Sequence, residues 1–344
     1  MKYILHSEYR TLEYLLWRIA NSNSPDNPFF LDNTTNQLAT KTFESKSRNL
    51  CSIILIDNVE CFFLKQPTSS ELGSNSTIIN EKNFYDWIED KGFTNVPKFV
   101  DFDSYNAILT TEMVKKSTSL TATLKDNRTI IKDSDKWKKS ATIIEELAKL
   151  LATFHQITAY PPPTLFSERM PAFLPILDNP NVSDFSPLSI TNINYLNIEV
   201  KTFQRLFTEY AKKIIIETNR LWQFQTVIHF DFRTDNILLN NINEIVIADW
   251  EMCSLGDPVW DIATIFNCLP LVISNKPTLN NGLHYKEQLL NLITIFWNTY
   301  KKCSCDSISV EKLKTFWKCI QLRHYLEFNE NFDGIIDELT KDLV

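Results

Sequence analysis

Residues 226–261 read TVIHFDFRTDNILLNNINEIVIADWEMCSLGDPVWD, and this stretch decides which fold we expect for the whole chain. Two apolar runs within it, residues 237–239 and 245–248, have the length of strands, and the asparagines between them tolerate turn geometry. The pattern therefore predicts a loop, a strand, a turn and a second strand. A hairpin of this kind brings Asn236, which precedes the first strand, close to Asp249, which follows the second.

The polar residues of the stretch have an ordered spacing. Asn236 follows Asp231 by five residues, and Asp249 follows Asn236 by thirteen. Carboxylate and amide oxygens suit Mg²⁺, which takes one or two oxygens from the protein and the rest from water and phosphate. The same order occurs in kinases as a base Asp, a metal-binding Asn and a second metal-binding Asp. We therefore predict that Asp231 is catalytic and that Asn236 and Asp249 hold Mg²⁺. The prediction depends on the ordered set, because each short motif alone is common in turns and helix caps.

Three segments in this stretch carry a resemblance to a known family. HFDFRTDN (229–236), IADWE (247–251) and GDPVWD (256–261) together resemble the aminoglycoside phosphotransferase and choline kinase family. The resemblance implies an α+β, bilobal protein-kinase-like fold, with a small antiparallel-sheet N-lobe and a mainly helical C-lobe. It also implies a small-molecule kinase that uses ATP and Mg²⁺ and phosphorylates a hydroxyl group. The family usually has glycine where this chain has Phe230.

The length of the chain and the order of its strand-like and helical patterns agree with two lobes. At 344 residues there is room for two compact parts. Residues 1–28 contain an amphipathic helical pattern over 7–20, which we expect to pack on the N-lobe. Short strand-like runs follow, so residues 29–114 are the expected nucleotide-binding N-lobe. Long helical periodicities dominate residues 115–344, the expected C-lobe with the catalytic loop and the acceptor site.

A lysine and a glutamate in the expected N-lobe match the ion pair of the kinase fold. Lys65 ends an apolar strand, where its charge is suited to neutralising the α- and β-phosphates of a nucleotide. Glu81 lies in the first turn of a predicted helix over 79–90 and is the natural partner for that lysine. The sequence alone leaves Glu71 and Glu89 open as alternatives.

The loop that covers the phosphates in this fold is expected at residues 43–49. A kinase loop is usually rich in glycine, because the backbone must approach the phosphates closely, but this segment has none. Ser45 and Ser47 are therefore the candidate phosphate-contacting residues. The hinge that binds the adenine edge is expected after the strand at 107–111, and its residues are Glu112, Met113 and Val114.

Several other polar residues are expected to support the site. We predict that Asp257 and Asp261 fix the following loop and helix start through backbone hydrogen bonds. We also predict that His155 is structural and that His229 supports the loop through hydrogen bonds and does not transfer protons. The sequence leaves three partners open for Arg233, namely a phosphate, Asp235 and solvent.

Composition limits the class of partner. The net charge of −7 disfavours a nucleic-acid ligand, and no run of 18 apolar residues marks a membrane span. No secretory signal pattern opens the chain, and the seven cysteines form no paired framework, so we expect a cytoplasmic protein with reduced thiols. The expected partner is a small hydroxylated molecule, while the oligomeric state and the choice between ATP and GTP stay open.

Two other functions compete with the kinase prediction. One is a non-catalytic nucleotide-binding relative, favoured by the glycine-free loop and by Phe230. The other is a metal-dependent phosphohydrolase that uses His229, Asp231 and Asp249 as ligands, but it leaves Lys65 without a role. A protein substrate is disfavoured because the seven residues between Asp249 and Asp257 leave no room for a long activation loop.

Overall fold

The computed structural model describes most of the chain, namely residues 4–20, 38–43, 49–67, 77–126, 135–162, 165–170, 209–273, 282–304 and 308–328. The chain forms two compact units. Unit 1 comprises Met1–Ser119 and Asn236–Cys253, and unit 2 comprises Leu120–Asp235 and Ser254–Val344.

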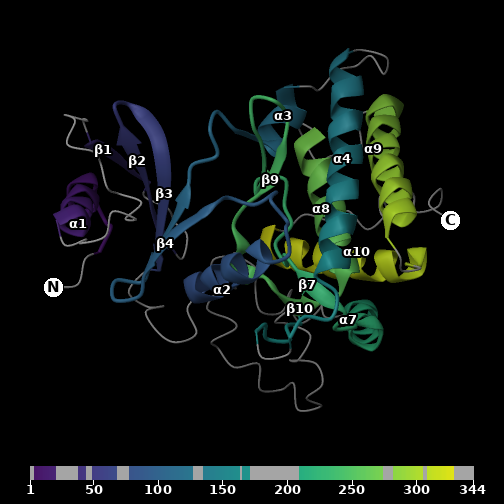
Figure 1. The fold of residues 1–344 in the computed structure, drawn as a ribbon. Helices are drawn as coiled ribbons and strands as arrows, with labels where there is room; N and C mark the ends of the chain where they lie inside the picture. The colour runs from purple at the N-terminus through teal and green to yellow at the C-terminus, as the bar shows by residue number, and fades with distance from the viewer. Residues whose placement is uncertain are drawn as a thin grey trace. The chain divides into compact units, whose positions relative to one another are not determined.

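Unit 1 contains one antiparallel sheet of five strands in the order β1-β2-β3-β5-β4 (Figure 1). The strands are β1 (Leu38–Phe43), β2 (Asn49–Ile56), β3 (Val59–Pro67), β4 (Phe99–Asp103) and β5 (Ile108–Glu112). The predicted turn between β2 and β3 holds Asp57 and Asn58 at φ values of 50° and 64°. Two consecutive residues with positive φ give the turn that matches the twist of a hairpin, and Asp and Asn adopt this conformation more readily than bulkier residues. The predicted hairpin is therefore confirmed.

Two helices cover the opposite faces of this sheet, α1 (Glu8–Ala20) and α2 (Thr77–Glu89) (Figure 1). Neighbouring residues of a strand point to opposite faces. Leu64 of β3 belongs to the apolar cluster that contains Tyr14 of α1, whereas Lys65, the next residue, bonds to Glu81 of α2. The alternation along β3 thus places one side chain in the α1 core and the next in the candidate site.

The predicted hairpin after the catalytic loop is also present. It consists of β8 (Ile237–Leu239) and β9 (Ile245–Ile247), and β6 (Thr118–Ser119) pairs with the outer edge of β8. Our sequence-based division placed this segment in the C-lobe, but it packs within unit 1. The Ile247 amide donates to the Asn95 carbonyl at 2.8 Å, and the Trp250 ring stacks on Phe84 of α2 at 4.0 Å between centroids.

Unit 2 is mainly helical. Its helices are α3 (Leu120–Asp126), α4 (Asp135–Ile157), α7 (Glu209–Leu221), α8 (Pro258–Ile273), α9 (Gly282–Cys303) and α10 (Val310–Phe328). Helices α4 and α9 lie side by side, while α8 packs against α10 (Figure 1). Nearly every residue of α8 is buried, in agreement with a helix that is apolar on all sides. A short antiparallel pair, β7 (Thr226–Ile228) and β10 (Ser254–Gly256), leads into and out of the catalytic segment.

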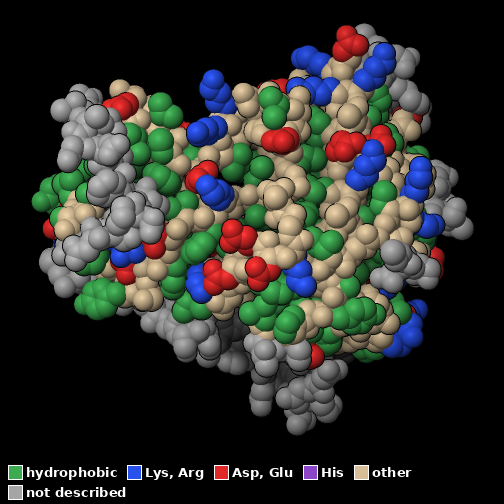
Figure 2. Space-filling view, viewed as in Figure 1, with side chains coloured by type: hydrophobic (Ala, Val, Ile, Leu, Met, Phe, Trp, Pro, Cys, Tyr) green, Lys and Arg blue, Asp and Glu red, His purple; other side chains and the backbone are tan. Residues whose placement is uncertain are grey.

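One face of the molecule can be inspected for the gathering of charged side chains. On the face drawn in Figure 2, basic and acidic side chains are mixed over the helices of unit 2. Mixed charges are typical of a solvated surface, whereas a nucleic-acid footprint gathers Lys and Arg on one face. Within the described residues, no helix combines the length and apolar character that a bilayer crossing needs.

Candidate functional site

Lys65 is the centre of a buried cluster of charges in unit 1. Its side chain is only 8% exposed, and its Nζ lies 2.9 Å from Oε2 of Glu81 and 2.7 Å from Oε2 of Glu251. It also contacts Oδ1 of Asp249. The predicted pair of Lys65 and Glu81 is therefore present. Of the alternatives, Glu89 is exposed, and Glu71 lies outside the described residues.

The charges of this cluster depend on one another. Burial disfavours the charged form of Lys65, but Glu81, Asp249 and Glu251 outweigh that effect and hold the pKa of the lysine well above its usual value. Burial also raises the pKa of Glu81, and the nearby Lys65 opposes this shift. Because three carboxylates surround one ammonium group, a bound cation or an incoming phosphate has to rearrange the same set of contacts.

The sequence prediction missed Glu251. It lies in a single 3₁₀ turn, Trp250–Met252, that follows directly after Asp249. Asn80 of α2 holds the backbone of this turn, because its Nδ2 donates to the carbonyl groups of Glu251 and Cys253 at 3.0 and 2.7 Å. The Glu251 carboxylate also accepts from Asn49 of β2. No periodic pattern in the sequence marks such a residue, since its position depends on contacts with the distant segments α2 and β2.

The two predicted metal ligands lie at the same end of the β8–β9 hairpin. The Ala248 amide donates to the Asn236 carbonyl at 2.9 Å, so Asn236 is opposite the residue that precedes Asp249. Asp249 has a φ of 68°, a left-handed conformation that ends the strand abruptly. One carboxylate oxygen of Asp249 also lies within 4.8 Å of oxygens from Glu81 and Glu251. Oxygen donors of this kind fit Mg²⁺.

A cavity of about 300 Å³ opens beside Lys65, and all the residues that line it belong to unit 1. Its polar lining consists mainly of Asn49, Lys65, Glu81, Glu112, Asp249 and Glu251. Its apolar lining includes Phe63, Leu109, Met113, Val114, Leu238 and Ala248. The predicted Lys65, Glu81 and Asp249 are thus brought together with the predicted hinge residues. Asn236 does not line this cavity, and Ser45 and Ser47 lie outside the described residues.

The hinge segment is fixed by the sheet. The Met113 amide donates to the Cys61 carbonyl and the Glu112 amide to the Lys98 carbonyl, both at 2.8 Å. These bonds hold residues 112–114 as the continuation of β5 at the rim of the cavity.

Asp231 belongs to unit 2, in the loop that follows β7. Its carboxylate is one third exposed, and its Oδ1 lies 2.9 Å from Nε of Arg233. The sequence left the partner of Arg233 open between a phosphate, Asp235 and solvent, and the structure shows Asp231 instead. The pairing holds the carboxylate in one position without burying it.

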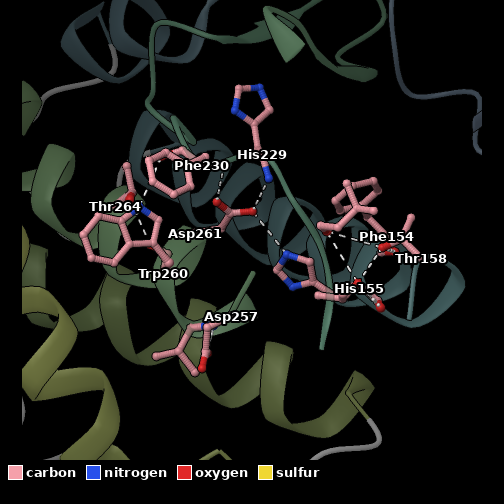
Figure 3. A network of polar contacts seen from close by, with 12 residues as sticks. Phe154, His155, Thr158, His229, Phe230, Asp257, Trp260, Asp261 and Thr264 are labelled. Atoms are coloured by element: carbon pink, nitrogen blue, oxygen red, sulfur yellow. Dashed lines mark hydrogen bonds and ion pairs between the residues drawn. The ribbon is translucent and has the colours of Figure 1, made fainter. Parts of the chain in front are cut away.

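Buried Asp261 organises this loop. Its Oδ2 accepts the His229 amide at 2.8 Å and its Oδ1 accepts the Phe230 amide at 2.9 Å (Figure 3). His155 of α4 contacts the same carboxylate at 3.2 Å, and Tyr300 of α9 contacts the other ring nitrogen of His155 at 2.7 Å. Asp261 is fully buried and comes from α8, so three helices determine where the residues just before Asp231 lie. Asp261 does form backbone hydrogen bonds, but they fix the loop before Asp231 and not the following loop and helix start that we predicted. His155 has a structural position, as predicted.

Asp257 fixes the start of α8, as predicted, while the backbone amide of His229 bonds to Asp261. The ring of His229 points away from Asp261 and packs edge-on against Phe232, with centroids 5.9 Å apart (Figure 3). Asp257 accepts the Val259 amide at 3.1 Å at the start of α8 and the Gln223 amide at 3.0 Å. Lys312 of α10 lies 2.6 Å from the same carboxylate and offsets the cost of burying it.

We expect Asp261→Asn to impair the loop as well as the fold. The amide keeps one acceptor but turns an N–H donor toward the backbone N–H groups, so about 2 kcal/mol of unfolding free energy should be lost. If Asp231 is catalytic, as the sequence predicts, activity should also fall by about tenfold or more, since small displacements of a catalytic group are costly. Denaturant unfolding and steady-state kinetics measure the two effects.

Asp103→Asn is the matched control for this prediction. Asp103 is also buried and accepts two backbone amides, those of Tyr105 and Asn106, but it lies in β4 of unit 1. It should lose a similar amount of stability while the folded enzyme keeps its turnover rate. Equal losses of turnover in both variants would show that Asp261 acts only on stability.

A second cavity, of about 310 Å³, lies beside Asp231 within unit 2. Its walls come from the loop after β7 and from α3, α8 and α10. The charged lining is mixed, with Asp231 and Asp235 against Arg233 and Lys125. Cys268 also lines it, and burial raises the pKa of its thiol to about 12, which keeps it uncharged.

Comparisons with known proteins agree with this geometry. A family model described as the phosphotransferase enzyme family matches residues 41–277, a range that contains every site residue predicted from the sequence. No curated protein matches the chain.

Solved structures of small-molecule kinases are similar in fold. A glucosamine kinase is 13% identical with a TM-score of 0.59, over 98% of this chain and 82% of that chain. An ADP-bound aminoglycoside phosphotransferase, APH(2'')-Ib, is 14% identical with a TM-score of 0.52, over 90% and 93% of the two chains. A choline/ethanolamine kinase family protein from Mesorhizobium loti is 12% identical with a TM-score of 0.50, over 97% and 93%.

These likenesses confirm the predicted α+β, protein-kinase-like fold, and the family match adds the assignment. Because that match extends over more than half of the sequence, the chain belongs to the phosphotransferase enzyme family.

Proposed function

We propose that this protein is a small-molecule kinase that transfers the γ-phosphoryl group of ATP to a hydroxyl group. The observation that carries the proposal is the buried pair of Lys65 and Glu81 at 2.9 Å, with Asp249 in contact with the same lysine at the wall of a cavity. A lysine side chain that a buried glutamate holds extended is suited to neutralising the charge of a phosphate group. A phosphohydrolase that uses His229, Asp231 and Asp249 has no need of it.

The cavity in unit 1 supports a nucleotide as its ligand. Met113, Val114, Leu238 and Ala248 offer the apolar surface that an adenine ring needs. Because the amides of Glu112 and Met113 are already donated within the sheet, we expect the adenine edge to meet carbonyl groups of this segment and the backbone of Val114. Lys65 would then contact the α- and β-phosphates, and Ser45 and Ser47 stay candidates for the loop that covers them.

Asn236 and Asp249 are the residues that would hold Mg²⁺. Their amide and carboxylate oxygens are hard donors of the type that this ion prefers. When bound, the ion would spread the negative charge that develops on the phosphoryl oxygens. Glu251 adds a third oxygen donor near Asp249 that the sequence did not predict.

Asp231 would position the acceptor. In the reaction the bond between the γ-phosphorus and the bridging oxygen of ADP breaks, and a bond forms between that phosphorus and the acceptor oxygen. The hydroxyl proton passes to Asp231 and then to solvent, while ADP leaves with the electron pair of the broken bond. An ordinary carboxylate is a weak base for an alcohol, so we expect orientation of the hydroxyl to contribute more than basicity.

A direct screen tests the proposal. The protein is incubated with ATP or GTP, Mg²⁺ and single acceptors that include glucosamine, ethanolamine, choline and aminoglycosides, chosen after the structurally similar kinases. The expected result is a product whose mass has increased by one phosphoryl group. Nucleotide binding without any product would favour the non-catalytic alternative, and release of phosphate from phosphoesters without ATP would favour the hydrolase.

We expect Asp249→Asn to weaken the binding of Mg²⁺ in a measurable way. Loss of one carboxylate removes a ligand charge, so the Mg²⁺ concentration for half-maximal activity should rise by more than about tenfold, the usual effect of disturbing even an indirect metal partner. A titration of activity against Mg²⁺ measures this shift. Glu244→Gln, an exposed residue at the tip of the same hairpin, is the control and should leave the curve unchanged. A superimposable curve for Asp249→Asn would remove Asp249 from the metal site.

A further inference from the structure

Phe230, the residue before Asp231, has an unusual backbone conformation. Its φ is 70°, in the left-handed region that side chains beyond Asn and Asp rarely adopt. Glycine adopts this conformation without strain, so the backbone alone gives no reason for a phenylalanine here. Strain of this kind persists only where the surroundings hold the residue firmly and where the residue serves a purpose.

Four contacts hold Phe230 in place. Its amide donates to Oδ1 of Asp261 at 2.9 Å, and its carbonyl accepts from Nε1 of Trp260 at 3.2 Å. Its ring packs on the Trp260 ring with centroids 5.8 Å apart (Figure 3). The guanidinium of Arg169 lies over the same ring, 5.3 Å from its centroid. Only the last two contacts need the aromatic ring, so backbone bonds fix the loop and ring contacts fix the side chain.

The same residue lines the cavity beside Asp231. With about 310 Å³, this cavity is at the small end of the range of roughly 300–1,000 Å³ typical of ligand pockets. Trp260, Thr264, Cys268 and Ile320 form further parts of its wall. Trp260 and Thr264 are both buried and come from α8, so the wall on this side is rigid.

We infer that Phe230 is a specificity-determining residue that limits the acceptor to about the size of one sugar ring or a small amino alcohol. The inference rests on the proposed function, since it assigns the cavity beside Asp231 to the acceptor. The ring lies against Trp260 and Arg169 and lines the cavity next to Asp231, so it takes up space that a larger acceptor would need in order to bring its hydroxyl group to this carboxylate. Removing the ring enlarges the cavity at the point where transfer takes place.

Two substitutions separate the ring from the backbone. Phe230→Gly removes the ring and also relieves the left-handed strain, whereas Phe230→Ala removes the ring and keeps the strain. Both are assayed with ATP and Mg²⁺ against ethanolamine, glucosamine, the two-ring neamine and the three-ring kanamycin. Phe224→Ala, which removes a partly exposed ring of the same unit, is the control.

The expected result is a change in selectivity. The ratio of kcat/KM for the multi-ring acceptors to that for the small ones should rise by at least about tenfold in both Phe230 variants, the usual discrimination of a pocket that loses a wall. The control should keep the wild-type ratio. If the kcat/KM ratio rose much more in Phe230→Gly than in Phe230→Ala, the cause would be relief of backbone strain and not loss of the ring. The inference therefore requires similar increases in the two variants.

The outcomes separate this inference from the proposed function. If wild-type protein phosphorylates the small acceptors and the variants keep the wild-type ratio, the inference fails and the kinase function stands. Wild-type protein that uses kanamycin as readily as glucosamine also overturns it. If neither wild-type nor variant protein phosphorylates any acceptor in the wider screen, the proposed function fails and this inference fails with it. A circular dichroism melt of each variant confirms that the protein assayed is folded.

Discussion

Asp231→Asn should abolish phosphotransfer almost completely while nucleotide binding is retained. We expect kcat to fall by about 10³-fold, within the range measured for the loss of a catalytic acid or base. Asparagine has no charge, so Arg233 loses its ionic partner. Because asparagine has nearly the same shape as aspartate, the loop should keep its backbone bonds to Asp261. Single-turnover assays of transfer and nucleotide titrations measure the two quantities separately.

The control for Asp231→Asn is Asp126→Asn. Asp126 is an exposed aspartate at the end of α3 in the same unit, and it is not among the residues that line the cavity, so its change removes one negative charge without altering the lining. It should leave kcat within the error of the assay. Full activity in Asp231→Asn would mean that another group receives the acceptor hydroxyl, and the assignment of the catalytic residue would then be wrong.

Lys65→Met should be the most destabilising single change in unit 1. It leaves buried Glu81 next to Asp249 and Glu251 without a compensating cation. Removal of one partner of a buried ion pair costs about 3–5 kcal/mol, which corresponds to a fall in Tm of roughly 5–10 °C. Transfer activity should also be lost, because the phosphates would no longer meet an ammonium group. Thermal unfolding and kinetics below the Tm measure the two effects.

A double variant distinguishes the two roles of Lys65. In Lys65→Met/Glu81→Gln the uncompensated carboxylate is neutralised, so much of the stability should return, whereas activity should not. Lys41→Met is the matched surface control. Its exposed pair with Glu60 should contribute no more than about 0.5 kcal/mol. If the double variant were as unstable as the single one, the stability of unit 1 would not depend on the charge balance around Lys65.

The sequence predicted the elements of the site well, because each has a strong local signal. The β8–β9 hairpin follows from two apolar runs around an asparagine-rich turn, and α4 and α9 follow from long helical periodicities. Lys65 and Glu81 were paired from their positions in a strand and in a helix, and the structure shows the bond between them. These elements could be predicted because their patterns depend on the spacing of residues along the chain, which tertiary contacts do not change.

Other features have no signal of this kind. Glu251 reaches Lys65 only because Asn80 of α2 holds a 3₁₀ turn more than 150 residues away in sequence. Arg233 pairs with Asp231 although the sequence allowed several partners. The β8–β9 segment joins unit 1 because Ile245 and Ile247 bond to Asn95 and because Trp250 stacks on Phe84. Contacts between distant segments decide all three outcomes.

The sequence by itself determined the family to which the chain belongs and the order of Asp231, Asn236 and Asp249, on which the proposed chemistry depends. Only the tertiary structure decided how the side chains of the candidate site are positioned. Asp261 of α8 fixes the backbone before Asp231, Phe230 takes a left-handed conformation against Trp260, and three carboxylates surround Lys65. The physical reason is that residue type and spacing specify which atoms are available, whereas burial and packing between distant elements specify their charge state and position.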